Sequence, residues 1–304
     1  MCTVMNKPLI TCLTYWVTMT KNNYIYAGIK GDHNEYENAK VLLQSIPYDG
    51  TSTWGKGADK GFEAFLDASE NMEIYDIETD SEVYEQGVHI LEPIMEDSSP
   101  EAVFKTVYGK TKELLKTDKF LTFFGGEHSI SIGVIKAFYE AHPDVTILQL
   151  DAHTDLRPDF HGSPYNHACA VYDASQNSNL IQVGIRSMDS GELPYLDREK
   201  CFFAEHMYGQ TEWMQDSISK MTDKVYITLD LDVFDPSIMP ATGTPEPGGM
   251  DWNTMIRYLK KVFTQKDVIG FDIVELAPID NIKAPQFLAA KLYYKMLSYK
   301  FANS

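Results

Sequence analysis

The chain has 304 residues, of which 44% are hydrophobic and 23% charged. This length and apolar content suffice for one large core, so we expect a single α/β domain. The formal charge of −18 argues against a nucleic-acid partner, whose phosphates would be repelled, and is compatible with a small cationic substrate.

The N-terminal segment precedes the predicted domain. Its apolar stretch, Pro8 to Met19, is interrupted by threonines, lacks a small-residue cleavage site and is too short to span a bilayer. We interpret residues 1–20 as an N-terminal extension and residues 21–304 as the domain. No other apolar run approaches membrane length, so we expect no membrane partner.

The cysteines indicate the compartment rather than the chemistry. Cys2, Cys12, Cys169 and Cys201 show neither close pairing nor a zinc-binding spacing, which predicts reduced thiols in a cytoplasmic protein. Cys169 lies near the motif described below, but no thiolate-activating pattern surrounds it, which argues against a nucleophilic role.

Strands and helices alternate along the chain. The pattern predicts, in order, strand 39–46, helix 62–68, a short strand or edge segment 72–77, helix 98–116, strand 120–124, helix 129–142, strand 145–150, strand 180–185, helix 212–220, strand 224–229, helix 252–264, strand 268–274 and helix 284–299. Ser99 followed by Pro100 marks a helix start, and His142-Pro143 a helix end. Such alternation is typical of a mostly parallel sheet covered by helices on both faces.

Three potential metal ligands follow the strand 145–150 at alternate positions: Asp151, His153 and Asp155. A lone Asp-Xaa-His would be weak evidence, because both side chains can simply bond the backbone at a strand end. Three ionisable groups packed this closely need a cation or a proton to balance their charge.

Two further strand ends repeat this arrangement. His128 follows strand 120–124 through a Gly-Gly turn, and Asp230 and Asp232 follow strand 224–229. Open α/β sheets place their sites beyond the carboxyl ends of strands, so these ligands converge if the three strands are neighbours. Four carboxylates and two imidazoles suit two divalent ions, with Asp151 and Asp230 as the predicted bridges.

Three other residues are candidates for a role at the same edge of the sheet. His161 is near enough in sequence to fold back over the motif as a proton carrier, although an exposed loop histidine explains it equally well. His167 allows the same two interpretations, and the exposed one is favoured. Glu275 ends strand 268–274, where a carboxylate without a metal role suits a planar cation; the alternative is a capping or salt-bridged glutamate.

With these residues assembled, the chain resembles the ureohydrolase family, the arginases and agmatinases. The matching motifs are Gly125-Gly126-Glu127-His128-Ser129, Asp151-Ala152-His153-Thr154-Asp155, His161-Gly162, Asp230-Leu231-Asp232-Val233-Phe234-Asp235-Pro236, Thr242-Gly243-Thr244-Pro245 and Asp272-Ile273-Val274-Glu275. The resemblance implies a three-layer α/β/α fold, a single catalytic domain over 21–304, two Mn²⁺ ions per subunit bridged by hydroxide, and a homo-oligomer, a trimer or hexamer.

The resemblance also implies roles for single residues. His128 and Asp155 would bind the first ion and His153 and Asp232 the second, with Asp151 and Asp230 contacting both. His161 would match the proton-shuttle histidine of the family, and Glu275 its guanidinium-binding acid. Bridging hydroxide would attack the guanidinium carbon, and Asp155 or His161 would deliver the proton that lets the amine leave and releases urea.

Within the family, agmatine is the expected substrate, with putrescine and urea as products in polyamine biosynthesis. Only five residues, 156–160, separate Asp155 from His161, whereas arginases carry a longer loop there with contacts to the α-amino and α-carboxylate groups. The alternatives are 4-guanidinobutanoate, arginine or another ω-guanidino compound. From other classes, a dinuclear phosphoesterase, a single-zinc deacetylase-like hydrolase and a non-catalytic metal-binding relative also remain as hypotheses.

Overall fold

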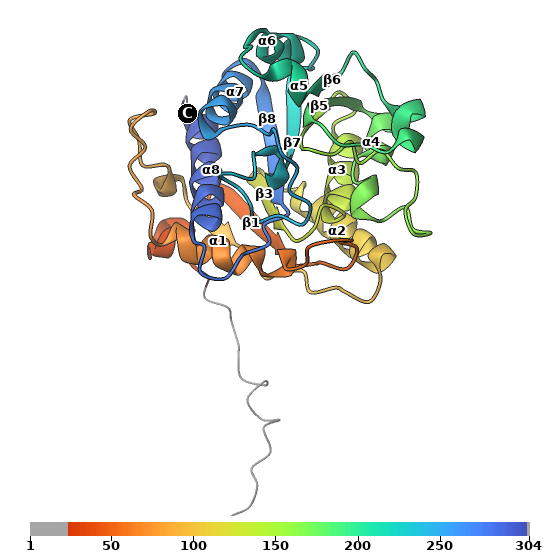
Figure 1. The fold of residues 1–304 in the computed structure, drawn as a ribbon. Coiled ribbons are helices and arrows are strands. Elements are labelled where there is room, and N and C mark those ends of the chain that lie inside the picture. Colours follow the sequence, from red (N-terminus) through yellow and green to blue (C-terminus); the bar gives the residue numbers. More distant parts are fainter. Residues whose placement is uncertain (1–23, 303–304) are drawn as a thin grey trace, which may run out of the picture.

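A parallel sheet of eight strands runs through residues 24–302, the part of the chain that the computed structural model describes (Figure 1). The strands are β1 (Val41–Ile46), β2 (Val88–Ile90), β3 (Phe120–Gly125), β4 (Thr146–Leu150), β5 (Asn179–Ile185), β6 (Cys201–Phe203), β7 (Lys224–Asp230) and β8 (Asp267–Val274). Their order across the sheet is β2-β1-β3-β8-β7-β4-β5-β6. The predicted extension, residues 1–20, lies outside the described residues.

Helices cover both faces of this sheet (Figure 1). They are α1 (Gly61–Ser69), α2 (Pro100–Leu114), α3 (Ile130–Ala141), α4 (Tyr172–Asn177), α5 (Ala204–Met207), α6 (Glu212–Ser219), α7 (Trp252–Gln265) and α8 (Ala284–Phe301). Side chains of α1, α6, α7 and α8 share one hydrophobic core, and those of α2, α3 and α4 share the other. The expected three-layer α/β/α fold with a parallel sheet is therefore confirmed.

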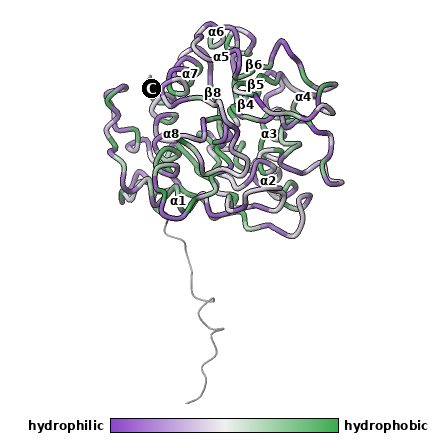
Figure 2. The backbone as a smooth tube through the Cα atoms, in the orientation of Figure 1, coloured by the Kyte–Doolittle hydropathy of each residue, from purple (hydrophilic) through white to green (hydrophobic). Residues whose placement is uncertain are grey.

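Strand β3 shows why apolar runs predicted the sheet. All six of its residues are buried. Phe120 and Phe124 pack into the core with α1 and α8, whereas Leu121 and Phe123 pack into the core with α2 and α3. Successive side chains of a strand point to opposite faces, so a strand covered on both sides reads as a continuous apolar run. Figure 2 shows the hydrophilic positions gathered mainly on the outer loops.

The predicted helix ends are confirmed where a capping pattern marks them. The Ser99 hydroxyl accepts a hydrogen bond from Ala102 N at 3.1 Å, and Pro100 is the first residue of α2. Helix α3 ends at Ala141, immediately before His142-Pro143. In both cases the signal is local, because a cap or a proline acts on its own turn of backbone.

The short strand or edge segment expected at 72–77 is wrong. Within this segment only Asp76 takes part in pairing, as an isolated bridge to Ser81, and Ile77 is 87% exposed. The edge position beside β1 belongs instead to β2, whose three residues are too few to show a period of two. The other unpredicted elements, β6, α4 and α5, are likewise only three to six residues long.

The strand order brings four strand ends to the middle of the sheet. The chain passes from β3 to β4 and leaves a gap, which β8 and β7 fill later in the sequence. Strands β3, β8, β7 and β4 are consequently adjacent, and all their pairings are parallel. Their carboxyl ends form one edge, where the predicted ligands lie.

Candidate metal centre

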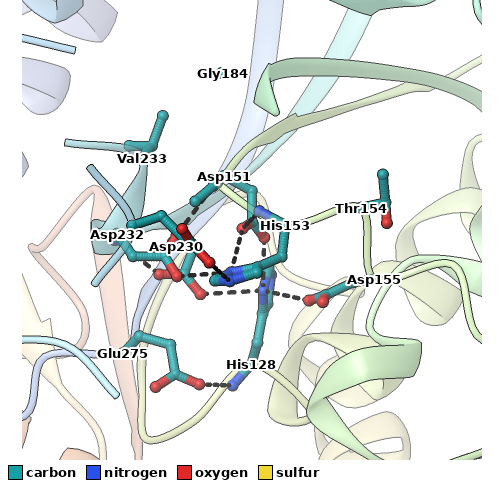
Figure 3. Close-up of polar contacts among 12 residues, drawn as sticks. His128, Asp151, His153, Thr154, Asp155, Gly184, Asp230, Asp232, Val233 and Glu275 are labelled. Carbon is teal, nitrogen blue, oxygen red and sulfur yellow. Dashed lines mark hydrogen bonds and ion pairs between the residues drawn. The ribbon is translucent and has the colours of Figure 1, made fainter. Parts of the chain in front are cut away.

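The first group of predicted ligands surrounds His128, which follows β3 (Figure 3). Its Nδ1 lies 3.1 Å from Asp151 Oδ2, 3.1 Å from Asp155 Oδ2 and 3.3 Å from Asp230 Oδ2. All four side chains are buried. A cation placed among these atoms would have one nitrogen and three oxygen donors.

The second group surrounds His153. Its Nδ1 lies 2.9 Å from Asp232 Oδ2 and 3.7 Å from Asp151 Oδ1. Asp151 therefore belongs to both groups through different oxygens, Oδ2 toward His128 and Oδ1 toward His153. His128, Asp151 and Asp155 in the first group and Asp151, His153 and Asp232 in the second have the donor spacing of a metal site, and the shared carboxylate is the arrangement expected of a bridge between two ions.

The hydrogen bonds of His128 test whether a metal fits. Its Nε2 lies 2.9 Å from the Thr228 hydroxyl, and that hydroxyl donates to Asp272 Oδ1 at 2.7 Å. The Thr228 oxygen must therefore accept from Nε2–H, so Nδ1 is the nitrogen whose lone pair a metal would take. Although burial disfavours the imidazolium, Asp151, Asp155 and Asp230 raise the pKa of His128 well above its ordinary value, so without metal a proton occupies this position. Nδ1 is buried and has no hydrogen-bond partner. A buried ring nitrogen that is oriented by the Nε2 hydrogen bond and faces three carboxylates fits a divalent cation.

The charges of the cluster also favour a divalent cation at this site. Although burial disfavours the imidazolium, Asp232 and Asp151 raise the pKa of His153 to about 12. Burial, together with Asp232 and Asp151, raises the pKa of Asp230 well above its ordinary value. Without metal, the site thus balances its carboxylates with protons, and divalent cations would replace them.

Backbone geometry turns two of the predicted side chains toward this centre. Asp155 and Glu275 have φ values of 49° and 68°, in the left-handed region that side chains other than glycine rarely adopt. Gly126 is needed in the turn after β3, because a Cβ there would lie 1.8 Å from Tyr48 O. Gly126 O in turn accepts from Glu275 N at 2.9 Å, so the β3 turn supports Glu275.

Glu275 joins the metal ligands in one cavity. Its Oε1 accepts from His128 N at 2.8 Å (Figure 3), and burial raises its pKa well above the ordinary value. The cavity has a volume of about 250 Å³. Its lining residues are Thr53, His128, His153, Thr154, Asp155, Arg157, Phe160, His167, Ala168, Ser187, Met188, Asp189, Glu192, Asp230, Asp232, Thr244 and Glu275.

Known proteins are similar to this chain in sequence and in fold. The model of the Arginase family matches residues 39–298. The chain belongs to the arginase family. It is 34% identical over 276 residues to the N(1)-aminopropylagmatine ureohydrolase of Synechocystis sp., covering 87% of this chain and 90% of that protein, and 35% identical over 270 residues to the protein of the same name from Thermus thermophilus, covering 87% and 92%.

A solved structure agrees with these relatives. The agmatine ureohydrolase of Thermoplasma volcanium superposes with a TM-score of 0.83 at 28% identity, covering 93% of this chain and 96% of that one. The prediction of a ureohydrolase of the agmatinase type is therefore confirmed at the level of enzyme class. Among the described residues of this arginase-family chain, no helix is both long and apolar enough to cross a bilayer.

The structure separates the two candidate histidines. His161 is exposed, lies against Phe160 with ring centroids 4.2 Å apart and the rings tilted by 48°, and is not among the residues that line the cavity. His167, for which an exposed loop position was favoured, lines the cavity and is partly buried. The missed signal was local: the Asn166 side chain accepts from Ala168 N and caps a short 3₁₀-helix that holds His167.

The cavity lining also includes three residues for which sequence reasoning predicted no role at the site: Arg157, Asp189 and Glu192. The guanidinium of Arg157 lies 4.4 Å from the Phe160 ring centroid, 3.8 Å from Asp189 and 4.0 Å from Glu192. Glu192 is buried and accepts from Thr154 Oγ1 at 2.8 Å, which braces the central motif. Nearby Cys169 is buried, which raises the pKa of its thiol to about 12 and agrees with a non-nucleophilic residue.

Proposed function

We propose that this chain hydrolyses the guanidinium group of a small guanidino-amine and releases urea, with agmatine as the first candidate substrate. The observation that carries the proposal is the pair of ligand groups sharing Asp151 in the cavity that also holds Glu275. A metal pair beside an unliganded buried carboxylate provides both a site of activation and an anchor for a planar cation.

The proposed ions are two Mn²⁺, held by His128, Asp151, His153, Asp155, Asp230 and Asp232. The oxygen-rich donor set, four carboxylates and two imidazoles, favours a hard ion over Zn²⁺. When bound, such ions supply Lewis acidity and lower the pKa of a water molecule near the substrate.

The remaining proposed roles belong to protein side chains. Glu275 Oε1 is engaged by His128 N, which leaves Oε2 to accept from a guanidinium N–H and orient the group. Proton transfer to the leaving amine falls to Asp155, which lines the cavity, and to His167. We assign this second role to His167 rather than His161, because His161 is exposed and away from the cavity lining.

The cavity lining supports an amine tail on the substrate rather than a carboxylate tail. Apart from histidines, Arg157 is the one cationic side chain among the described residues that line it, and Asp189 and Glu192 lie within 4.0 Å of its guanidinium. An anionic tail, as in arginine or 4-guanidinobutanoate, would meet these acids without a free cation. N1-aminopropylagmatine is a second candidate, because relatives named for it share 34% and 35% identity with this chain.

Parallel urea assays test the proposal. Mn²⁺-loaded protein is given agmatine, N1-aminopropylagmatine, arginine or 4-guanidinobutanoate, with Asp151→Asn as the inactive control. We expect the highest kcat/KM for one of the two amines and no urea from the variant. Higher turnover of arginine or 4-guanidinobutanoate would keep the chemistry and reject the amine substrate.

The same protein preparation examines the competing classes. Hydrolysis of a generic phosphate ester without urea release would favour a dinuclear phosphoesterase, and no turnover at full metal loading would favour a non-catalytic relative. The cavity argues against a phosphoesterase, since it is rich in carboxylates and its Arg157 already contacts two of them.

We further propose a homo-oligomer, a trimer or hexamer, in the cytoplasm. The family resemblance supports the assembly, and exposed Tyr75, Ile77 and Phe287 around one groove on the α7–α8 side supply apolar surface for a contact. The unpaired thiols of Cys169 and Cys201 fit a reducing compartment. Light scattering tests the oligomeric state, and a monomer would contradict the proposed assembly. Cell fractionation tests the location, and an exported protein would contradict it.

A further inference from the structure

One hydroxyl holds His167 from a distant part of the chain. Thr51, in the loop after β1, accepts a hydrogen bond from His167 N at 3.0 Å, and the same Oγ1 lies 3.1 Å from His167 Nδ1. The two residues are 116 positions apart in sequence. Two contacts from a single oxygen, one to the backbone and one to the ring, fix both the position and the rotation of the imidazole.

The direction of the ring hydrogen bond follows from the other partner of Thr51. Glu127 is completely buried and accepts from Ser129 N at 2.9 Å and from Ser129 Oγ at 2.7 Å. Burial raises its pKa, and the nearby Thr51 side chain opposes this effect, lowering the pKa and favouring the charged form. A carboxylate accepts hydrogen bonds, so we assign the one hydroxyl proton of Thr51 to Glu127. With this assignment the Thr51 oxygen accepts from the ring, and His167 Nδ1 carries the proton.

This assignment leaves His167 Nε2 with a free lone pair. The ring lines the cavity that contains Asp155 and Glu275, so Nε2 is the nitrogen available to a proton in that cavity. A histidine that exchanges protons through Nε2 needs Nδ1 held in this donor state, as outer partners do for many functional histidines.

We propose that Thr51 is a positioning residue: with Glu127 behind it, it fixes His167 in the Nδ1–H tautomer with Nε2 facing the reacting groups. The inference rests on the proposed role of His167 in urea release. Thr51 itself touches neither substrate nor metal ligands in this scheme. Its contribution is to keep the proton-carrying nitrogen oriented.

A simpler explanation is that Thr51 only packs its loop against the cavity, and two substitutions separate the alternatives. Thr51→Val keeps the shape of the side chain and removes the hydroxyl, whereas Thr51→Ser keeps the hydroxyl and removes a methyl group. A packing role predicts losses in both variants, and the positioning role predicts rescue by serine. His167→Asn and the double variant Thr51→Val/His167→Asn complete a double-mutant cycle.

The expected kinetics are specific. Thr51→Val lowers kcat about 10- to 100-fold, in line with losses at outer-shell partners of functional histidines, and leaves KM within about threefold. Thr51→Ser stays within about threefold of the unmodified enzyme in both constants. In the His167→Asn background, Thr51→Val causes no further loss. Equal losses in the serine and valine variants, an unimpaired valine variant, or additive losses in the double variant would each overturn the proposal.

Crystal structures of the two Thr51 variants supply a readout that does not depend on turnover. We expect the His167 ring to rotate or shift in Thr51→Val and to keep its contact in Thr51→Ser, with unchanged thermal unfolding in the serine variant. A ring that stays in place without the hydroxyl would refute the positioning role. Absence of urea release by the unmodified enzyme would instead refute the proposed function, so the two failures are distinguishable.

Discussion

At the scale of single residues, Asp151 shows how one carboxylate can belong to two groups of potential metal ligands. It is fully buried, and its two oxygens face different histidines, Oδ2 toward His128 and Oδ1 toward His153. Its position directly after β4 was readable from the sequence, because the apolar run ends there. Its shared position between the two groups depends on the β3 and β7 ends as well, and therefore on the packed sheet.

Glu275 gives the first prediction at this scale. Glu275→Gln keeps an oxygen that can accept from His128 N but loses the negative charge offered to the guanidinium. A charged hydrogen bond contributes roughly 1.5–3 kcal/mol, so we expect kcat/KM to fall by about 10- to 100-fold or more. Steady-state urea assays measure the loss, and metal analysis should show unchanged stoichiometry.

The control for this substitution is Glu205→Gln, which alters a carboxylate whose side chain is 79% exposed. Both activity and metal content should be preserved in that variant. If Glu275→Gln retained full kcat/KM, the proposed guanidinium anchor would have to be abandoned.

At the scale of elements, caps and cross-links position the helices around the site. The start of α2 depends on Ser99, whose hydroxyl accepts from Ala102 N. Ser99→Ala removes this acceptor, and we expect a loss of about 1 kcal/mol in the free energy of unfolding. Urea denaturation measures it. Ser98→Ala, one residue earlier and outside the cap, is the matched control and should unfold like the original protein; equal losses would reject the capping role.

Glu78 ties the segment before β2 to α7 and α8. It accepts from Lys260 Nζ at 2.9 Å, Lys295 Nζ at 2.5 Å and Tyr299 Oη at 2.6 Å. Burial opposes ionisation, but these three donors outweigh it and lower the pKa of Glu78 to about 2. Because the folded-state pKa is depressed, the stabilisation is fully present above the unfolded pKa of about 4.3 and is lost as pH falls toward 2.

We therefore predict a pH-dependent effect of Glu78→Gln. The substitution should lower the free energy of unfolding by about 1 kcal/mol at pH 7, a figure discounted for the partial exposure of Glu78. The deficit should shrink as pH falls below about 4.3. Denaturation at several pH values measures the trend, with Glu101→Gln, from an exposed pair with Lys105, as the control. A deficit that does not change with pH would contradict the ionic origin.

At the scale of the whole molecule, the two hydrophobic cores and the cluster of potential metal ligands have opposite effects on the stability of the folded state. The cores on the two faces of the sheet stabilise the fold, whereas the cluster concentrates four carboxylates at its centre. Cations that bind the folded state alone raise its stability by mass action, by about 2.7 kcal/mol at a concentration 100 times Kd.

Metal addition should accordingly raise the melting temperature. For the chelator-treated protein we expect an increase of several degrees with saturating Mn²⁺, and a smaller one with Mg²⁺. Differential scanning fluorimetry measures both. Asp151→Asn, which disrupts both ligand groups, should show little response to Mn²⁺. A similar Mn²⁺ shift in that variant would place the binding elsewhere.

The sequence by itself determined the strand-helix order and the identity of the metal-ligand candidates. The signals are local: each ligand lies within a few residues of the end of an apolar run, and caps such as Ser99 act on adjacent backbone. The same local signals could not resolve β2 or β6, which are too short to show a period.

Only the tertiary structure decided which strand ends meet and which histidine reaches the cavity. The adjacency of β3, β8, β7 and β4 arises from pairings between segments far apart in sequence. The choice between His161 and His167 is similar, because it depends on a loop held by Thr51 from 116 residues away. The Asn166 cap is a local sign of the turn at His167, but the contact with Thr51 sets the path of that loop, and the neighbours of His167 along the chain do not encode this distant contact.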